Sequence, residues 1–359
     1  MLPVARFKER PEDFVVDEIP AYPASGEGDH LFVTFRKVGL NSQEAVTVLA
    51  RALGVAPRDA GVAGMKDKVA VTTQTASFQL PRALDPAPLL AAIDRPDLVL
   101  LDSKRHNNKL KPGHLEGNRF SIWLRGLSAE DCSAIELSLE RVRDFGFPNY
   151  FGAQRFGRAR DNAERAAAFV RGDSKPPRDK HQIRFLFSAL QSELFNRTLE
   201  LRQADGSFTR ALAGDLAKKR DTGGLFLVPS EGPELADAER RAGSLEISAT
   251  GPMFGASMRN PEGVPFELEQ AVLSASGVTD EQLARYRHAG EGTRRPLRVV
   301  ASELVWERAP AEDALRVSFV LPKGSYATTL LESVANLEEP RREPVPPQES
   351  PENLAPPDA

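Results

Sequence analysis

The chain has 359 residues, a length typical of two domains. Hydrophobic residues make up 41% and charged residues 27%, a composition that favours a folded soluble protein over a disordered or membrane-spanning one. Taken alone, the formal net charge of −4 argues against nucleic acid as a partner, because phosphate binding depends on Lys and Arg. The single cysteine, Cys132, excludes an internal disulfide, and the scattered histidines form no zinc-binding pattern.

The N-terminal sequence lacks an apolar signal segment, and no 18-residue apolar run occurs in the chain. We therefore expect a cytoplasmic protein without a membrane segment. The negative charge belongs to one segment: residues 338–359 carry six acids, two bases and seven prolines. Such a segment cannot bury enough apolar surface to fold, so we expect a disordered Pro/Glu-rich tail at 338–359 and a neutral folded body before it.

The first third of the chain predicts strands and helices. The asparagine and glutamate at Asn41 and Glu44 have the spacing of a capping box, and apolar residues then recur on one helix face until Gly54. A second helix is expected over 128–145. Alternating or β-rich runs predict strands at 13–19, 31–35, 62–63, 69–78 and 120–124.

Helical patterns dominate the middle of the chain, at 161–170 and 183–201, with loops at 172–178 and 223–233. Strand patterns return at 297–306 and 315–321, and a final helix is expected over 324–337. Strand-rich ends around a helical middle predict an α+β protein in which one discontinuous domain contains an insertion.

Two windows are strongly basic despite the neutral body. Residues 104–125 have a net charge of +5 and residues 141–160 of +4. Solvated faces are the ordinary explanation for such windows. RNA recognition is the alternative, because cations contact phosphates while rings and amides contact unstacked bases. The windows contain such residues: Asn107, Asn108, Asn118, Phe120, Asn149, Tyr150, Phe151, Gln154 and Phe156.

The loop from Gly64 to Lys68 places Asp67 between Lys66 and Lys68. By composition it is an ordinary turn. In the functional interpretation, neighbouring cations hold the Asp67 carboxylate ionised, so that it acts as a nucleophile or a base. The sequence has no GxSxG elbow, phosphate-binding loop, dinucleotide-binding glycine motif or PCxxC zinc motif, so we expect chemistry that needs neither a metal nor a cofactor.

Several strings of the sequence resemble a known family. Six strings are similar to signature blocks of the tRNA pseudouridine synthase D (TruD) family, and they occur in the same order over residues 8–330. They are PEDFVVDE (11–18), GEGDH (26–30), GMKDKVAVTTQ (64–74), GNRF (117–120), NYFGAQRFG (149–157) and LPKGSYAT (321–328).

The resemblance implies a V-shaped α+β protein built on the mixed β-sheet of pseudouridine synthases. The catalytic domain would comprise residues 1–145 and 301–337, and a family-specific TRUD domain would be inserted at 146–300. The implied activity is cofactor-independent isomerisation of uridine-13 of tRNA to pseudouridine, with tRNA as the partner.

The resemblance also implies roles for individual residues. Asp67 is the catalytic carboxylate, which attacks the sugar or the base or abstracts a sugar proton. Lys8 pairs with Asp67, and Phe120 stacks on the target uracil. Phe14, Asn118 and Tyr326 line the substrate pocket.

Several alternatives stay open. Phe14 and Phe120 alternate along strands and fit a core role equally well, and residues 149–157 fit a domain junction as well as an RNA contact. Tyr326 stands where we expect phenylalanine, and Ser42 where we expect threonine. The rival function is an RNA-binding protein or RNA chaperone of the same fold without turnover, and the main substrate of an enzyme could be an RNA other than tRNA.

Overall fold

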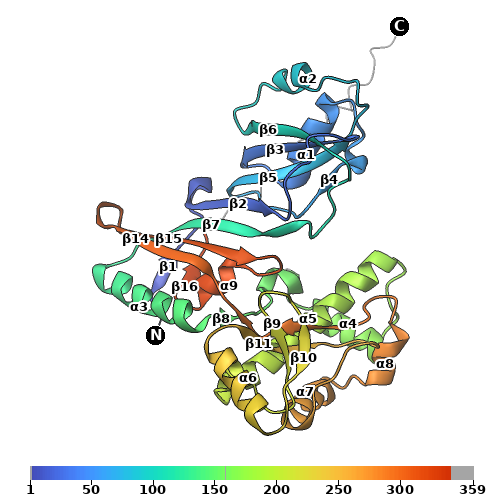
Figure 1. Cartoon of the computed structure of the whole chain (residues 1–359), viewed down its shortest axis with the longest axis vertical. Coiled ribbons are helices and arrows are strands. Elements are labelled where there is room, and N and C mark those ends of the chain that lie inside the picture. The colour runs from blue at the N-terminus through green and yellow to red at the C-terminus, as the bar shows by residue number, and fades with distance from the viewer. Residues whose placement is uncertain (1, 158, 341–359) are drawn as a thin grey trace, which may run out of the picture.

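The computed structural model describes residues 2–157 and 159–340 (Figure 1). Its largest feature is a ten-stranded sheet, made of β1 (Val4–Arg6), β2 (Phe14–Pro20), β3 (His30–Val38), β4 (Gly61–Val62), β5 (Val71–Gln79), β6 (Leu98–His106), β7 (Leu115–Arg125), β14 (Ser302–Ala309), β15 (Ala314–Pro322) and β16 (Asn336–Glu338). The main path runs β14-β15-β7-β2-β5-β3-β6. The sheet is mixed, because β2 pairs parallel to β5 and β1 parallel to β16, whereas the other pairs are antiparallel.

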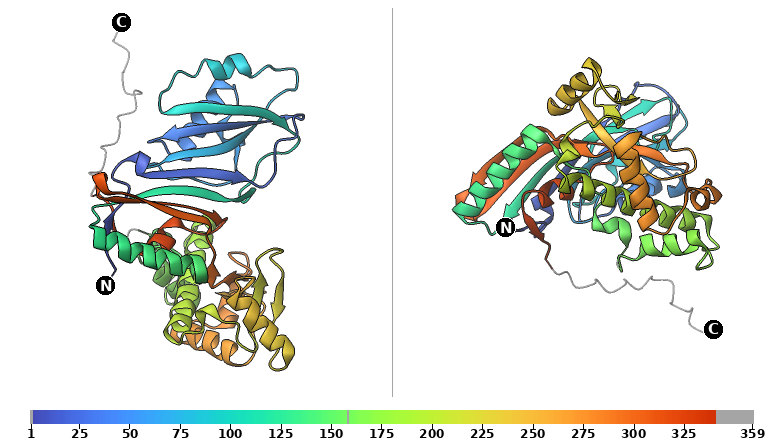
Figure 2. Two further views of the ribbon diagram at one scale, coloured as in Figure 1. Left: turned by 60° about the vertical axis from the view of Figure 1, so that its left-hand side comes forward. Right: turned by 90° about the horizontal axis from the view of Figure 1, so that it is seen from below.

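The middle of the chain forms a separate lobe in Figure 1 and in the left view of Figure 2. A small sheet, in the order β10-β9-β11-β12, lies there among helices. Its elements are α4 (Asn162–Arg171), α5 (Lys180–Ala204), β9 (Leu216–Lys219), β10 (Leu225–Leu227), α6 (Pro233–Gly243), β11 (Ile247–Met253), α7 (Gly263–Ala275), α8 (Asp280–Arg285) and β12 (Thr293–Pro296).

The chain enters and leaves this lobe side by side. The two-residue strand β8 (Phe147–Pro148) pairs antiparallel with β13 (Arg298–Val299), so the two ends of the middle segment meet. The strands of the large sheet therefore come from both sides of the middle segment in sequence, and the predicted α+β class with a mixed sheet is confirmed.

The two long helices of the sheet lobe, α1 (Ser42–Ala52) and α3 (Ala129–Phe145), begin where the sequence predicts. In α1, the Asn41 side chain accepts the Glu44 amide and the Glu44 carboxylate accepts the Asn41 amide, which completes the capping box. The same reciprocal pair, between Ser128 and Asp131, starts α3. The short helices α2 (Ala87–Ala91) and α9 (Ala327–Glu332) complete the lobe.

Two expectations for the middle and the end of the chain are wrong. The segment 223–233, predicted as a loop, contains strand β10, and the helix predicted over 324–337 ends at Glu332 and is followed by β16. Each strand has only three residues of unremarkable sequence. Strand β10 is held by the preceding strand β9, and β16 by β1 at the start of the chain. A local pattern cannot reveal a strand whose stability comes from its neighbour.

The predicted tail also begins too early. Glu338 ends β16 and its carbonyl accepts the Phe7 amide at 3.1 Å, while the amide of Asn336 donates to the carbonyl of Pro3 at 2.8 Å. These main-chain bonds tie the first described strand to the last one, which the Pro/Glu composition did not predict. The remainder of the expected tail, residues 341–359, lies outside the described residues.

Two hydrophobic clusters position the site on the large sheet. One packs α3 and α9 against β2, β7 and β15, and the other packs α1 against β3 and β5.

Within residues 2–157 and 159–340, no helix combines the length and the apolar character needed to cross a membrane.

Candidate active site

The loop between β4 and β5 carries Asp67 and is fixed through its backbone. The amide of Lys66 donates to the buried hydroxyl of Ser42 at 2.8 Å, and that hydroxyl donates to the side-chain oxygen of Gln74 at 2.8 Å. The first residue of α1 thus connects the loop to the strand that follows it. The serine that replaces the expected threonine keeps the one atom that makes these contacts.

A buried lysine holds the other side of the loop. The Nζ of Lys37 donates to the carbonyl of Asp67 at 2.8 Å and to the carbonyl of Leu40 at 2.6 Å. The residue is completely buried, and this burial lowers the pKa of the Lys37 ammonium to about 8. The ammonium therefore fixes the loop backbone and leaves the Asp67 carboxylate to a different cation.

That cation is Lys8, 59 residues earlier in the chain. Its Nζ lies 3.0 Å from Oδ2 of Asp67, whose side chain is 58% exposed, and 4.3 Å from the centroid of the Phe14 ring. The backbone of Lys8 has φ +56°, a strained left-handed conformation for a residue with a side chain. The structure thus brings together Lys8, Asp67 and Phe14, three of the predicted site residues.

The lysines adjacent to Asp67 form their ion pairs with other carboxylates. Lys66 pairs with Glu18 at 2.7 Å, with both side chains under 10% exposed, and Lys68 lies 3.5 Å from Glu44. The fold turns alternate side chains of the loop in different directions. In the structure the cation paired with Asp67 is Lys8, the residue that the resemblance implies, and not Lys66 or Lys68.

Sequence reasoning assigned no role to Lys37, Glu18 or Gln74. A signal was present for Lys37, because it continues the alternation of Leu31, Val33 and Phe35 and so falls on a buried face. A lysine at such a position needs polar partners.

Phe14 and Phe120 lie in the hydrophobic core of the large sheet. They are 4% and 7% exposed, and the Phe120 ring stacks on Phe319 with centroids 5.3 Å apart and meets Phe14 edge-on at 6.1 Å. This packing agrees with the core alternative. Phe14 is also the ring beneath Lys8, so the core reaches the surface at this site.

Asn118 lies on the same strand face as Phe120, two residues before it, and is half-buried. Its Oδ1 is buried and has no protein partner among the described residues. The same is true of Thr72 Oγ1 and Gln74 Nε2. Each of these three residues belongs to a signature string, and each presents an unsatisfied polar atom.

Tyr326 belongs to the junction between the lobes. Its half-buried ring lies 6.4 Å from the ring of Phe151, at the residue preceding α9. Arg295 covers the same Phe151 ring at 4.1 Å and donates to the carbonyls of Asn149 and Gly324. Burial lowers the pKa of Arg295 to about 10. The NYFG segment therefore contacts both lobes, in agreement with its junction alternative.

The cations of the two basic windows are not all available to an RNA. Several members are bound within the protein: Arg125 pairs with Asp13 at 2.7 Å, Arg119 with Glu303 at 2.5 Å, and Arg105 donates to three backbone carbonyls. In the second window Arg143 pairs with Asp144, and Arg158 lies outside the described residues.

In the part of the chain that the structure describes, no group of three His, Cys, Asp or Glu side chains is arranged to hold a metal ion.

Comparisons with known proteins bear on this arrangement. The family described as tRNA pseudouridine synthase D (TruD) matches residues 4–176 and 179–334. The chain is 45% identical over 332 residues to the tRNA pseudouridine synthase D of Anaeromyxobacter dehalogenans, with 90% of each chain covered. It is 42% identical over 328 residues to that of Thermus thermophilus, with 91% of this chain and 88% of the relative covered.

The fold has a solved counterpart as well. A crystal structure assigned to a tRNA pseudouridine synthase D of Methanosarcina mazei superposes with a TM-score of 0.76 at 24% identity. The superposition covers 93% of this chain and 94% of the other.

Proposed function

Because the chain belongs to the tRNA pseudouridine synthase D (TruD) family, we propose that it isomerises uridine-13 of tRNA to pseudouridine, in the cytoplasm and without a cofactor, with Asp67 as the catalytic carboxylate. The observation that carries this proposal is the exposed Asp67 carboxylate, paired with Lys8 on a loop whose backbone is fixed by buried groups.

The reaction needs one well-placed carboxylate. The N1–C1′ bond breaks, the detached uracil turns, and a C5–C1′ bond forms; C5 then loses its proton and N1 gains one. Asp67 either attacks the sugar or the base, or removes a sugar proton, and both routes require an ionised carboxylate. Lys8 is placed to orient that carboxylate, since its ammonium lies 3.0 Å from Oδ2 of Asp67.

We propose that the polar atoms around the site bind the uracil. The buried and unsatisfied Oδ1 of Asn118 is suited to accept a hydrogen bond from an imide N–H, because an unpaired buried acceptor gains most from a new donor. Phe14 and Tyr326 would line the pocket. Stacking of uracil on Phe120 requires the base to replace one of the rings that now flank it, Phe319 or Phe14.

We propose that residues 1–145 and 301–337 act as the catalytic domain and residues 146–300 as the inserted TRUD domain, with tRNA bound between them. This division is supported by the pairing of β8 with β13, where the chain enters and leaves the middle lobe. Extraction of a base from the RNA stack costs a few kcal/mol, and contacts from two lobes can offset that cost.

Tritium release from tRNA labelled at C5 of uracil tests the chemistry. We expect Asp67→Asn to abolish release while the exposed Asp59→Asn control keeps the wild-type rate. Lys8→Met should slow single-turnover release by about 10-fold or more, since hydrogen bonds to charged groups contribute ~1.5–3 kcal/mol, and should leave the Kd for tRNA unchanged. Wild-type release by Asp67→Asn would reject the mechanism.

Mapping pseudouridines in RNA from cells with and without the protein tests the substrate. Loss of the modification at uridine-13 alone supports the proposal. Losses in other RNAs would identify a different main substrate, and no loss anywhere, together with retained RNA binding, would favour the RNA chaperone.

A further inference from the structure

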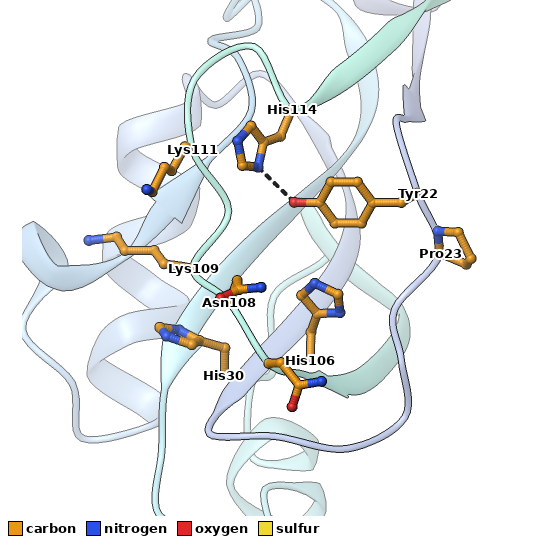
Figure 3. Close-up of a pocket in the computed structure, with 9 residues that line it drawn as sticks. Tyr22, Pro23, His30, His106, Asn108, Lys109, Lys111 and His114 are labelled. Carbon is orange, nitrogen blue, oxygen red and sulfur yellow. Dashed lines mark hydrogen bonds between the residues drawn. The ribbon is translucent and has the colours of Figure 1, made fainter.

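A polar pocket lies on the sheet lobe, and most of its lining residues belong to the basic window 104–125. Its volume is about 630 Å³, within the usual range of ligand pockets (Figure 3). The segment between β2 and β3 meets the loop between β6 and β7 there. The lining residues are Tyr22, Pro23, His30, His106, Asn107, Asn108, Lys109, Lys111 and His114.

One wall of the pocket is a series of stacked rings. Tyr22 stacks on His106 with centroids 5.3 Å apart at 21°, and His106 packs on Phe32 at 4.6 Å. The Tyr22 hydroxyl is hydrogen-bonded to Nδ1 of His114 at 2.6 Å, as Figure 3 shows. These contacts fix the orientation of the Tyr22 ring.

The GEGDH string positions this wall. Gly28 has φ +122°, and a Cβ at that position would lie 2.3 Å from the carbonyl oxygen of His106, so only glycine allows the two segments to approach. The amide of Ser25 donates to Nδ1 of His106 at 3.2 Å. Since Nδ1 accepts this bond, the ring proton of a neutral His106 lies on Nε2, which is then a donor.

The charge of the pocket is positive. None of the lining residues is acidic, and the ammonium groups of Lys109 and Lys111 extend to the same side of the pocket in Figure 3. No ion pair joins either lysine to a carboxylate in the described part of the chain. His30 adds an imidazole whose pKa is lowered by burial and then by Lys109. Its Nδ1 is buried and has no protein partner in the described chain.

The pocket is connected to the catalytic loop. The amide of Gly113 donates to the carbonyl of Ala63 at 2.8 Å, and Ala63 precedes Asp67 by four residues. Four residues span at most about 14 Å. Lys323, at the other side, donates to the carbonyl of Gly113 at 3.1 Å. The turn between the lining residues Lys111 and His114 is therefore a neighbour of the loop that carries Asp67.

We propose that this pocket binds an unstacked nucleotide of the RNA substrate, with the base against the Tyr22–His106 wall and its phosphate at Lys109 and Lys111. The combination of fixed rings, amides and uncompensated lysines is that of single-stranded RNA sites. The inference rests on the proposed function, because it takes the RNA to be the strand that is modified at Asp67. The pocket contributes affinity, and the chemistry remains at Asp67.

The test compares full-length variants in tRNA binding and in single-turnover tritium release at saturating enzyme. We expect Lys109→Ala with Lys111→Ala to weaken tRNA binding by about 10-fold and to reduce the salt slope of log K by about 0.8, since the two lysines share one phosphate and each phosphate contact contributes ~0.7–0.9. The saturated rate should stay within twofold of wild type. The control is Arg51→Ala with Arg58→Ala, two exposed cations of the same lobe, which should change neither quantity.

The aromatic wall has its own pair of variants. Tyr22→Leu removes the ring and should weaken binding by about 10-fold, because a stacked base contributes ~1–3 kcal/mol. Tyr22→Phe removes only the hydroxyl and should bind within twofold of wild type. Equal losses in both variants would overturn the stacking role.

Failure of the pocket and failure of the enzyme give different results. If the wild-type protein releases tritium while the lysine pair and Tyr22→Leu leave the affinity and the salt slope unchanged, the pocket proposal is overturned and the proposed function stands. If the wild type releases no tritium but the double variant of Lys109 and Lys111 still weakens RNA binding and lowers the salt slope, the proposed function is overturned and the pocket stands as an RNA-binding site.

Discussion

Replacement of Lys37 by methionine tests whether a buried ammonium positions the catalytic loop. Methionine keeps the length of the side chain and removes the donor to the carbonyls of Asp67 and Leu40. We expect the single-turnover rate of tritium release to fall by about 10-fold or more while the Kd for tRNA stays unchanged, because the loop loses its fixed position but no RNA contact.

The effect on stability depends on two opposing terms. Loss of two hydrogen bonds from a charged donor destabilises the fold by about 3 kcal/mol or more. Removal of the buried charge is favourable: the pKa of Lys37 falls from 10.5 to about 8, which corresponds to about 3 kcal/mol at ~1.36 kcal/mol per pH unit. At pH 7 we therefore expect the free energies of unfolding of the two proteins to agree to within about 1 kcal/mol.

The pH dependence of the free energy of unfolding distinguishes a balance of two opposing terms from a substitution that has no energetic effect. The pKa in the folded chain lies below that of the unfolded chain, so between pH 8 and 10.5 the unfolded chain binds the extra proton and the free energy of unfolding rises with pH. Urea denaturation at pH 7 and pH 10 should show the wild type gaining about 2.5 kcal/mol relative to Lys37→Met. Other groups titrate equally in both proteins and cancel in the difference.

A difference that stays constant between the two pH values would refute the reasoning, since it would mean that the Lys37 ammonium pays no desolvation cost in the folded state. Unchanged tritium release by Lys37→Met would separately refute its positioning role.

Two further predictions use matched pairs of variants. Arg125→Met should lower the free energy of unfolding, measured in urea, by about 3–5 kcal/mol, because it leaves the fully buried Asp13 without its main cation. Arg119→Met breaks an exposed ion pair and should change the free energy of unfolding by less than about 1 kcal/mol. Equal effects of the two variants would contradict the burial argument. Gly28→Ala should weaken tRNA binding and destabilise the sheet lobe, because its Cβ would meet the β6 backbone at 2.3 Å. Gly26→Ala has open space around it and should lower the free energy of unfolding by only about 1 kcal/mol. A thermal melt and a binding titration of both variants test this difference.

Much of the local structure was readable from short stretches of sequence. The capping pair Asn41 and Glu44 predicts the start of α1, and the alternation of Leu31, Val33 and Phe35 predicts β3, because a cap or a strand face is encoded within a few residues. The strand β16 could not be predicted in this way, since its main-chain bonds are made with β1, more than three hundred residues away.

The signature strings indicated Asp67 as a catalytic candidate, and the family resemblance indicated Lys8, 59 positions earlier, as its partner. Composition alone indicated the adjacent lysines, Lys66 and Lys68, which pair with other carboxylates. The acidic end of the chain accounts for the negative net charge. The charge pattern did not identify the RNA-binding surface, because several arginines of the basic windows form ion pairs within the fold.

The sequence by itself determined the α+β class, the order of most elements and the loop that presents Asp67, because periodicity, caps and specific strings are local properties. Only the tertiary structure decided which cation meets Asp67, which lysine is buried beneath its backbone, and that residues 22–30 and 106–114 enclose one pocket. These features depend on strand register and on which side chains share a face of the sheet, and both are set by contacts between segments far apart in the chain.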